Sequence, residues 1–408
     1  MHISIVGSLA ATATMLIASG CASTSLAQGS RAYDRGDYAS ALQQWLPLAQ
    51  RGDARAEFLV GVLYERGEGV PEDHAEAARW YTLSAERGDA LAANNLGLLY
   101  YAGDGVATDH AAAARWYRAA ASQGCPLAQG NYGVLCVLGQ GVPQDADEGR
   151  RWLTSAAERG NAKAAAFLGS MYYDGIGAPQ DYAMSARWRI AAAAKGVASA
   201  QHALGVMYQR GEGVERDAAT ACAWYLKAAE KGYGPAQNNL AIMYLEGEGT
   251  ARDLDRARAW SERAAAQRIP ESEFLLGWIH RNGLGVPVDA PRAAGHFTSA
   301  ATAGVPSAEA CLGSMYLNGE GVQQSDAEAA RWFARAAEHG SASAATDLAL
   351  LYLRGQGVDR DERAACMWNA LAAHNGSAIA NARRTGFARM LTADEQANAE
   401  RLASERAE

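Results

Sequence analysis

Two histidines are the side chains whose type and spacing come closest to carrying chemistry. His280 and His296 occupy positions where comparable segments of the chain have a tyrosine and a tryptophan. Imidazole changes its charge between about pH 5 and 8 and is a common metal ligand. If the two rings approach each other, they form a joint whose stability depends on pH or that binds a metal ion. The alternative is sequence divergence of this one segment, in which the two histidines fill aromatic positions and have no function of their own.

The six cysteines show no pattern of metal or disulfide chemistry. Cys125 and Cys136 lie on one expected helix, about 16 Å apart by helical rise, which is too far to bridge. Cys222 and Cys366 occupy the same position of distant segments, and no C-x-x-C pair occurs. We therefore predict that Cys125, Cys136, Cys222, Cys311 and Cys366 are ordinary buried residues without a metal.

No sequence motif of an enzyme is present, and no cofactor is expected. The chain of 408 residues lacks a P-loop, a dinucleotide fingerprint, a nucleophile elbow and a zinc-binding H-E-x-x-H. It also lacks the Ser-x-x-Lys pair of penicillin-binding enzymes. A formal net charge of −8 argues against a nucleic-acid partner, because phosphates require a basic surface.

Glycines spaced 36 residues apart define the elements that must position these side chains. The series runs from Gly52 to Gly232 and resumes at Gly304, with Arg268 at the one position that breaks it. We count offsets from each unit start. Glycine recurs at offsets 15 and 17, aspartate at 21, tryptophan at 28 and alanine at 33. A fixed period of this length is typical of stacked repeats.

Each unit is expected to form one helical hairpin. In the unit that starts at Gly88, Leu96 and Leu99 recur at helical spacing and indicate a first helix. The Gly-x-Gly turn at 103–105 ends it, and Asp109 is a typical N-cap for a second helix. Offset 9 is always glycine or alanine, so we expect large tryptophan and tyrosine side chains to pack over it.

This pattern resembles the Sel1-like repeat family, a relative of tetratricopeptide repeats. The resemblance is carried by A-x-A-x-x-x-L-G-x-x-Y-x-x-G-x-G-V-x-x-D at 90–109 and by A-x-x-W-Y-x-x-A-A-x-x-G at 113–124. It implies an all-α, right-handed solenoid with nine repeats over 52–376. An N-terminal capping hairpin over 30–51 and C-terminal capping helices over 377–408 would close its ends, with Thr392 as an N-cap before Glu395.

In such relatives the first helices line a concave side, where a partner binds. Offsets 6, 10 and 13 vary from unit to unit, as a recognition surface requires. An ordinary solvated face is an equal alternative. The resulting candidate partner-binding residues are Asn94, Tyr101, Tyr173, His202, Gln209, Asn238, Trp278 and Arg281.

The N-terminus indicates export. Residues 3–18 are mainly apolar and uncharged, which is typical of a signal peptide. The stretch that ends in Ser19-Gly20-Cys21 resembles a bacterial lipobox and predicts removal of residues 1–20 and lipidation of Cys21. Residues 21–29 would then be a polar spacer. Cleavage after Ala27 is the alternative, and it would yield a periplasmic protein without an anchor.

The resemblance implies a non-catalytic adaptor that binds a protein or peptide partner. With the lipobox-like stretch at Cys21, we expect this adaptor to lie in the bacterial envelope, anchored at the outer membrane and facing the periplasm. Two other functions stay open. One is a β-lactamase-like or other cell-wall hydrolase, an activity proposed for cysteine-rich relatives whose regular disulfides this chain lacks. The other is a scaffold of an envelope polysaccharide export complex.

Overall fold

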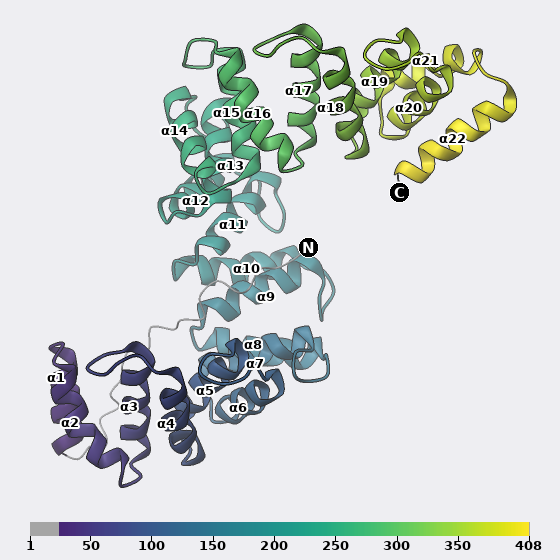
Figure 1. Cartoon of the computed structure of the whole chain (residues 1–408). Helices are drawn as coiled ribbons and strands as arrows, with labels where there is room; N and C mark the ends of the chain where they lie inside the picture. The colour runs from purple at the N-terminus through teal and green to yellow at the C-terminus, as the bar shows by residue number, and fades with distance from the viewer. Residues whose placement is uncertain (1–23, 408) are drawn as a thin grey trace. The chain divides into compact units, whose positions relative to one another are not determined.

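The computed structural model of the chain describes residues 24–407. This part of the chain forms 22 α-helices and no strand. The expected all-α solenoid of stacked helical hairpins is confirmed, and Figure 1 shows successive hairpins side by side within the described parts of the chain, as 54–86 beside 90–122 and 270–302 beside 306–338. The expected signal peptide and the expected lipidation site at Cys21 lie outside the described residues.

The two helices of each repeat have nearly constant lengths. The first helices are α3 (Ala54–Arg66), α5 (Ala90–Ala102), α7 (Pro126–Leu138), α9 (Ala162–Asp174), α11 (Ala198–Arg210), α13 (Gly234–Glu246), α15 (Pro270–Asn282), α17 (Pro306–Asn318) and α19 (Ala342–Arg354). The second helices are α4 (His74–Glu86), α6 (His110–Ser122), α8 (Ala146–Glu158), α10 (Tyr182–Ala194), α12 (Ala218–Glu230), α14 (Leu254–Ala265), α16 (Ala290–Thr302), α18 (Asp326–Glu338) and α20 (Glu362–His374).

The helices divide into two compact units, one reaching from the N-terminal helices to Met207 with residues 211–215, the other holding 208–210 and 216 onward. In the first unit α4, α6 and α8 each pack on their own first helix and on the next one, as α4 does on α3 and α5. In the second unit α14 packs in the same way on α13 and α15. Each hairpin therefore buries its apolar side against its neighbours, as repeat proteins must.

Glycine and aspartate set the turns as expected. Gly103 ends α5 in the left-handed conformation at φ 79°, and the Asp109 carboxylate accepts the amide of Ala112 at the start of α6. A second reason for the turn glycines is contact with the preceding repeat. A Cβ at Gly105 would collide with the backbone of His74, at the start of α4. The Gly-x-Gly turn thus fits against the preceding second helix.

The side chain that packs over offset 9 comes from offset 29. A Cβ at Gly97 would lie 2.8 Å from the ring of Tyr117, and a Cβ at Gly313 would lie 2.6 Å from Phe333. Tyrosine was expected to pack over offset 9, and the structure agrees with this part of the expectation. The tryptophans at offset 28 point one helical step away, and several, such as Trp116, pack between neighbouring clusters of the core.

Both ends of the array are covered by further helices. At the N-terminal end α1 (Thr24–Asp34) pairs with α2 (Tyr38–Ala49). Residues 24–29 are therefore helical, which corrects the expected polar spacer over 21–29. The physical reason is Trp45, whose indole Nε1 donates to the Leu26 carbonyl at 3.2 Å and leaves no room for a side chain at Gly29.

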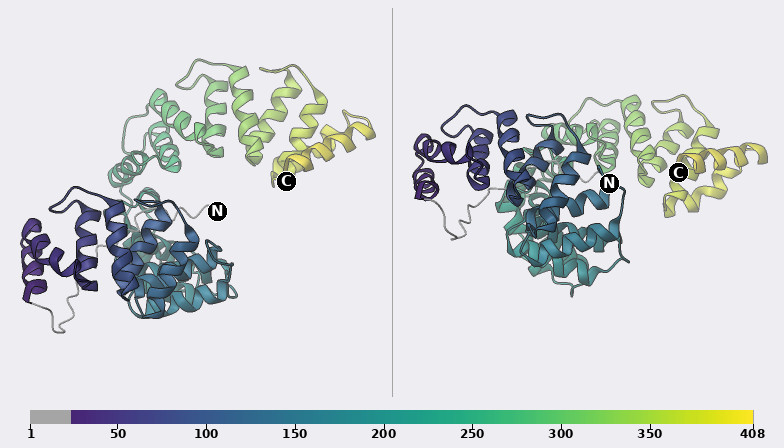
Figure 2. Two further views of the ribbon diagram at one scale, coloured as in Figure 1. Left: turned by 60° about the horizontal axis from the view of Figure 1, so that its bottom comes forward. Right: turned by 90° about the horizontal axis from the view of Figure 1, so that it is seen from below.

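The C-terminal end is formed by α21 (Ala378–Ala388) and α22 (Ala393–Ala407), which both pack on α20. In Figure 2 these yellow helices lie together at the end of the chain. Thr392 and Glu395 form a reciprocal cap, in which the Thr392 amide donates to the Glu395 carboxylate at 2.9 Å. The expected N-cap at Thr392 is confirmed.

Candidate binding surface on the first helices

The first helices expose one row of side chains. In each unit, offsets 3, 7, 10 and 14 follow one stripe of an α-helix, with offsets 3 and 14 mostly exposed and offsets 7 and 10 mostly half-buried. We call this row the first-helix surface. First helices of successive hairpins touch each other, as α7 does with α9 and α13 with α15. The residues of the first-helix surface at offset 10 are mostly apolar. They include Leu98, Val134, Val206, Ile242, Trp278 and Leu350.

Trp278 is the largest side chain on this surface. Its exposed fraction is 40%, and its ring lies 6.5 Å from the ring of Phe274 one helical turn earlier. Leu127 and Leu138 of α7 are exposed to a similar degree in the other unit. Of the eight candidate partner-binding residues, Trp278 is the one that the structure places on the solvent-facing row.

The four candidates at offset 13 point to the next hairpin instead. Each bonds the middle residue of the next Gly-x-Gly turn, 39 residues later. The distances are 3.1 Å from Tyr101 to Gln140, 2.7 Å from Tyr173 to Glu212, 3.1 Å from Gln209 to Glu248, and 2.9 and 2.7 Å from Arg281 to Glu320. These polar groups hold adjacent repeats in register, and they lie half-buried beside the first-helix surface.

The three candidates at offset 6 are largely covered by neighbouring helices. Asn94 accepts a hydrogen bond from Asn131 at 3.0 Å, and Asn238 accepts one from Ser272 at 2.8 Å. Both asparagines are buried. Burial and the nearby charge of Arg189 lower the pKa of His202 to about 4, so this imidazole is neutral at pH 7.

The two histidines of the irregular repeat lie together. Their rings stack at a centroid distance of 5.6 Å with 6° between their planes. His280 is buried and its Nε2 has no hydrogen-bond partner, whereas Nδ1 of His296 lies 2.8 Å from the Glu273 carboxylate. The same repeat contains Arg268 at φ 61°, the one non-glycine residue between 24 and 407 with positive φ. We call the stacked pair the histidine joint.

The histidine joint is expected to weaken the protein in acid. The pKa of His280 is lowered by burial first and then by Arg292 and His296, with a smaller effect of Arg258, whereas Asp289 raises it. The folded state thus keeps His280 neutral, while the unfolded chain takes up a proton below about pH 6.5. The stabilisation is complete above that pH and is lost as the pH falls toward the lowered pKa.

Urea unfolding between pH 7.5 and 5 measures this effect. In the double variant His280→Tyr, His296→Trp, the joint has the residues of the other repeats. The difference in unfolding free energy between the variant and the parent should grow as the pH falls. His202 is present in both proteins, so its contribution cancels in the difference between their unfolding free energies. A difference that stays constant over this range would show that the joint does not titrate with unfolding.

A column of buried polar side chains at offset 5 was missed by the sequence analysis. Where it is glutamine, the amide donates to a carbonyl of the preceding helix, as Gln201 does to Ala193 at 3.1 Å. Where it is glutamate, a cation approaches: Arg87 lies 3.1 Å from Glu57. The signal in the sequence is the recurrence of Gln or Glu at one position in six of nine repeats.

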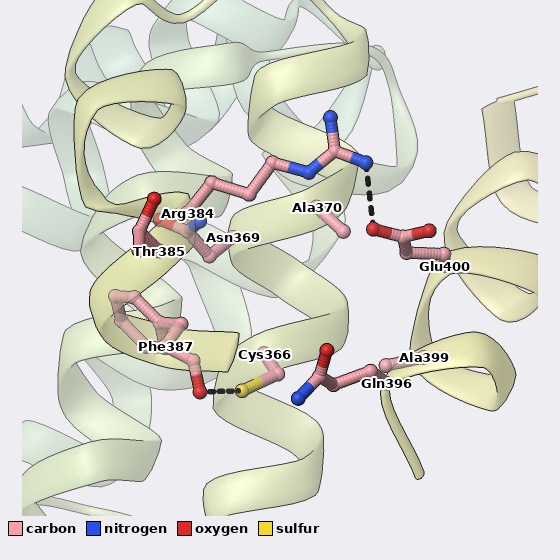
Figure 3. Close-up of a pocket in the computed structure, with 9 residues that line it drawn as sticks. All are labelled: Cys366, Asn369, Ala370, Arg384, Thr385, Phe387, Gln396, Ala399 and Glu400. Carbon is pink, nitrogen blue, oxygen red and sulfur yellow. Dashed lines mark hydrogen bonds and ion pairs between the residues drawn. The ribbon is translucent and has the colours of Figure 1, made fainter. Parts of the chain in front are cut away.

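One cavity, of about 320 Å³, lies between α20, α21 and α22 (Figure 3). The Cys366 thiol points to its floor and donates to the Phe387 carbonyl at 3.2 Å, and burial raises the pKa of this thiol to about 11. Arg384 and Glu400 pair with each other at 2.6 Å on the other side. The thiol is therefore protonated at neutral pH, and the charged groups are already paired.

Residues 24–407 hold neither a cluster of metal ligands nor a helix that could span a membrane. Between residues 24 and 407, no three His, Cys, Asp or Glu side chains gather as metal ligands do. Cys125, Cys136, Cys222, Cys311 and Cys366 are free thiols, four of them buried. No helix in this range is both long enough and apolar enough to cross a bilayer.

Comparison with known proteins identifies the repeat. The Sel1 repeat model matches nine times, at residues 54–89, 90–125, 126–161, 162–197, 198–233, 234–268, 270–305, 306–341 and 342–377. No protein of curated function matches the chain. Two solved structures are similar over most of both chains.

The first is a protective antigen present in uropathogenic Escherichia coli strains, with 31% identity over 94% of this chain and 91% of that one, and a TM-score of 0.52. The second is a Sel1 repeat protein from Oxalobacter formigenes, with 33% identity over 78% and 93%, and a TM-score of 0.57. The chain therefore belongs to the Sel1 repeat family, whose members generally serve as non-enzymatic scaffolds for protein–protein interaction.

Proposed function

We propose that the protein is a non-catalytic scaffold of the bacterial envelope that binds a protein or peptide along its first-helix surface. The observation that carries the proposal is Trp278, which the chain leaves exposed on a row of aliphatic side chains. Tryptophan is enriched among the few residues that supply most of the binding energy at protein interfaces. The matched pairs at offset 13 keep this row in register.

Trp278→Ala tests the binding surface. Crosslinking and pull-down from the native envelope should recover the partner with the parent protein. The variant should lose about 2 kcal/mol or more of binding free energy, as an interface anchor does. Ile190→Ala is the matched control, because Ile190 is 43% exposed on the second helix α10. Equal recovery by the parent and Trp278→Ala would place the partner elsewhere.

The envelope location rests on the N-terminal sequence and on one relative. The stretch before Cys21 supports export and lipidation, and stable anchoring requires more than one acyl chain. The Escherichia coli relative is described as a protective antigen, which favours exposure to the host. Labelling with a radioactive fatty acid should mark the parent and not Cys21→Ser. An unlabelled parent would favour cleavage after Ala27 and a form without a lipid anchor.

The non-catalytic part of the proposal has its own test. We expect purified protein to leave the β-lactam nitrocefin intact at concentrations where a β-lactamase hydrolyses it within seconds. Turnover that persists through purification, and in a preparation from a strain without β-lactamases, would favour the hydrolase alternative instead.

A further inference from the structure

The side chain at offset 29 reaches the first-helix surface through the gap that glycine leaves at offset 9. The Tyr81 hydroxyl bonds the carboxylate of Glu65 and accepts a hydrogen bond from Asn95 at 3.3 Å. The Tyr225 hydroxyl donates to Gln209 at 2.9 Å. In these repeats the polar tip of the side chain ends among first-helix residues and is satisfied there.

Arg189 occupies the same position in the hairpin of α9 and α10. Its side chain passes over Gly169, where a Cβ would lie 2.5 Å from its Cγ. Its guanidinium carbon lies 4.5 Å from the centre of the Tyr173 ring. Arg189 is 8% exposed, yet within residues 24–407 no acceptor makes a hydrogen bond or ion pair with it. Its nitrogen atoms are not among the buried unpaired ones, so they reach solvent and an acceptor from outside can bind them. A largely covered guanidinium without an ion pair is uncommon, because burying an unpaired charge is costly.

The neighbouring charges do not compensate this cation. The Tyr173, Asp174 and Glu212 side chains raise the pKa of Arg189, but burial outweighs them and the pKa is lowered. Glu212 already accepts the Tyr173 hydroxyl at 2.7 Å. His202, on the facing helix, is neutral at pH 7 and adds no competing positive charge. The guanidinium therefore lacks an anion of its own.

We propose that Arg189 anchors a carboxylate of the partner, a peptide that lies on the first-helix surface beside Tyr173. This inference rests on the proposed function and names the chemistry of its partner. A guanidinium presents two parallel donors that match the two oxygens of a carboxylate. One side of the guanidinium is already covered, since its carbon lies 4.5 Å from the centre of the Tyr173 ring. The carboxylate is either a C-terminus or an acidic side chain.

Three small probes separate these sources. N-acetylglycine carries a C-terminal carboxylate, N-acetylaspartate α-methylamide carries a side-chain carboxylate, and N-acetylglycinamide is neutral. Each is titrated into the full chain at constant ionic strength while the Nε–H resonances of arginine are followed by NMR. The Arg189 signal, assigned by its loss in Arg189→Lys, should move saturably with at least one carboxylate and remain fixed with the amide.

Arg187 is the matched control, because it lies on the same helix, is exposed and stacks over Trp188 at 5.4 Å. Its signal should not move. Arg189→Tyr should fold as the repeats with tyrosine at offset 29 do. Calorimetric titration with the carboxylate probe that moves the Arg189 signal should show at least a tenfold lower affinity for this variant than for the parent. An Arg189 signal that ignores both carboxylates, or that moves no more than that of Arg187, would overturn the inference.

These outcomes are distinct from those that test the proposed function. If Trp278→Ala loses the partner while Arg189 ignores carboxylates, the binding surface stands and the carboxylate anchor does not. If Arg189 binds carboxylates while no partner is recovered, the anchor stands and the proposed scaffold function is the part that fails.

Discussion

Replacing Phe333 by alanine is expected to lower the free energy of unfolding by about 3–5 kcal/mol, as large-to-small aromatic changes in cores do. Phe333 is 1% exposed and lies over Gly313, in the centre of the hairpin of α17 and α18. Because a solenoid is stabilised by contacts between neighbours, the loss should weaken adjacent repeats as well. Urea unfolding followed by circular dichroism measures it, and a second transition is expected to appear.

A double-mutant cycle checks that the contact with offset 9 is the cause. Gly313→Ala alone is expected to cost about 1–3 kcal/mol, since its new methyl group meets the Phe333 ring. Two repeats have alanine at offset 9, and there offset 29 is Ser261 or Asn369 rather than an aromatic residue. In a Phe333→Ser background, Gly313→Ala should therefore cost almost nothing. Additive effects of the two changes would contradict the packing described here.

Removal of both basic side chains beside Glu309 is expected to destabilise the protein by about 3 kcal/mol. Glu309 is fully buried, with Arg335 at 3.1 Å and His339 at 2.8 Å from its carboxylate. The double variant Arg335→Ala, His339→Ala leaves this charge buried and unpaired, which costs about 3–5 kcal/mol in proteins. We expect the lower end of that range because the Arg335 and His339 side chains are both half exposed.

Glu309→Gln is the matched control. Its amide can donate to the Ala301 carbonyl, eight residues earlier, as Gln201 does to Ala193. The single change should therefore cost less than about 1 kcal/mol, the net contribution of a typical hydrogen bond. In the Glu309→Gln background the double change should lose most of its effect. An equal cost in both backgrounds would mean that lost packing of Arg335 over Trp332, and not the charge, is responsible.

The repeat itself could be predicted because its signals are local. The glycines that end first helices and the aspartates that begin second helices act within a few residues of the chain, and their recurrence every 36 residues can be seen directly in the sequence. Thr392 and Glu395 cap α22 for the same reason. The extent of α1 was harder, because what orders residues 24–29 is Trp45, a residue of the next helix.

The candidate site was harder because exposure depends on neighbours that a single helix does not reveal. Offsets 6 and 7 differ by about 100° around the helix axis, as do offsets 13 and 14. Asn238, at offset 6, bonds the next hairpin, whereas the adjacent offset 7 belongs to the first-helix surface. Periodicity locates the polar side of a first helix, but contacts across the repeat decide which part of it stays free. Trp278 could be identified because it is the one aromatic residue at offset 10, where the other repeats have aliphatic residues or serine.

The bond between offset 13 and the next turn has a consequence for how such a chain changes its length. Deleting any 36 consecutive residues keeps the glycines in phase, so the backbone can close over the missing repeat. The side chains are less permissive. Loss of residues 268–303 would bring Leu245 to the position of Arg281, opposite Glu320, which would then have no donor from the preceding repeat. A repeat can therefore be duplicated or lost without cost only where the new neighbours at offset 13 and in the next turn still form a hydrogen-bonded pair. The order of the repeats matters for this reason as well as their number.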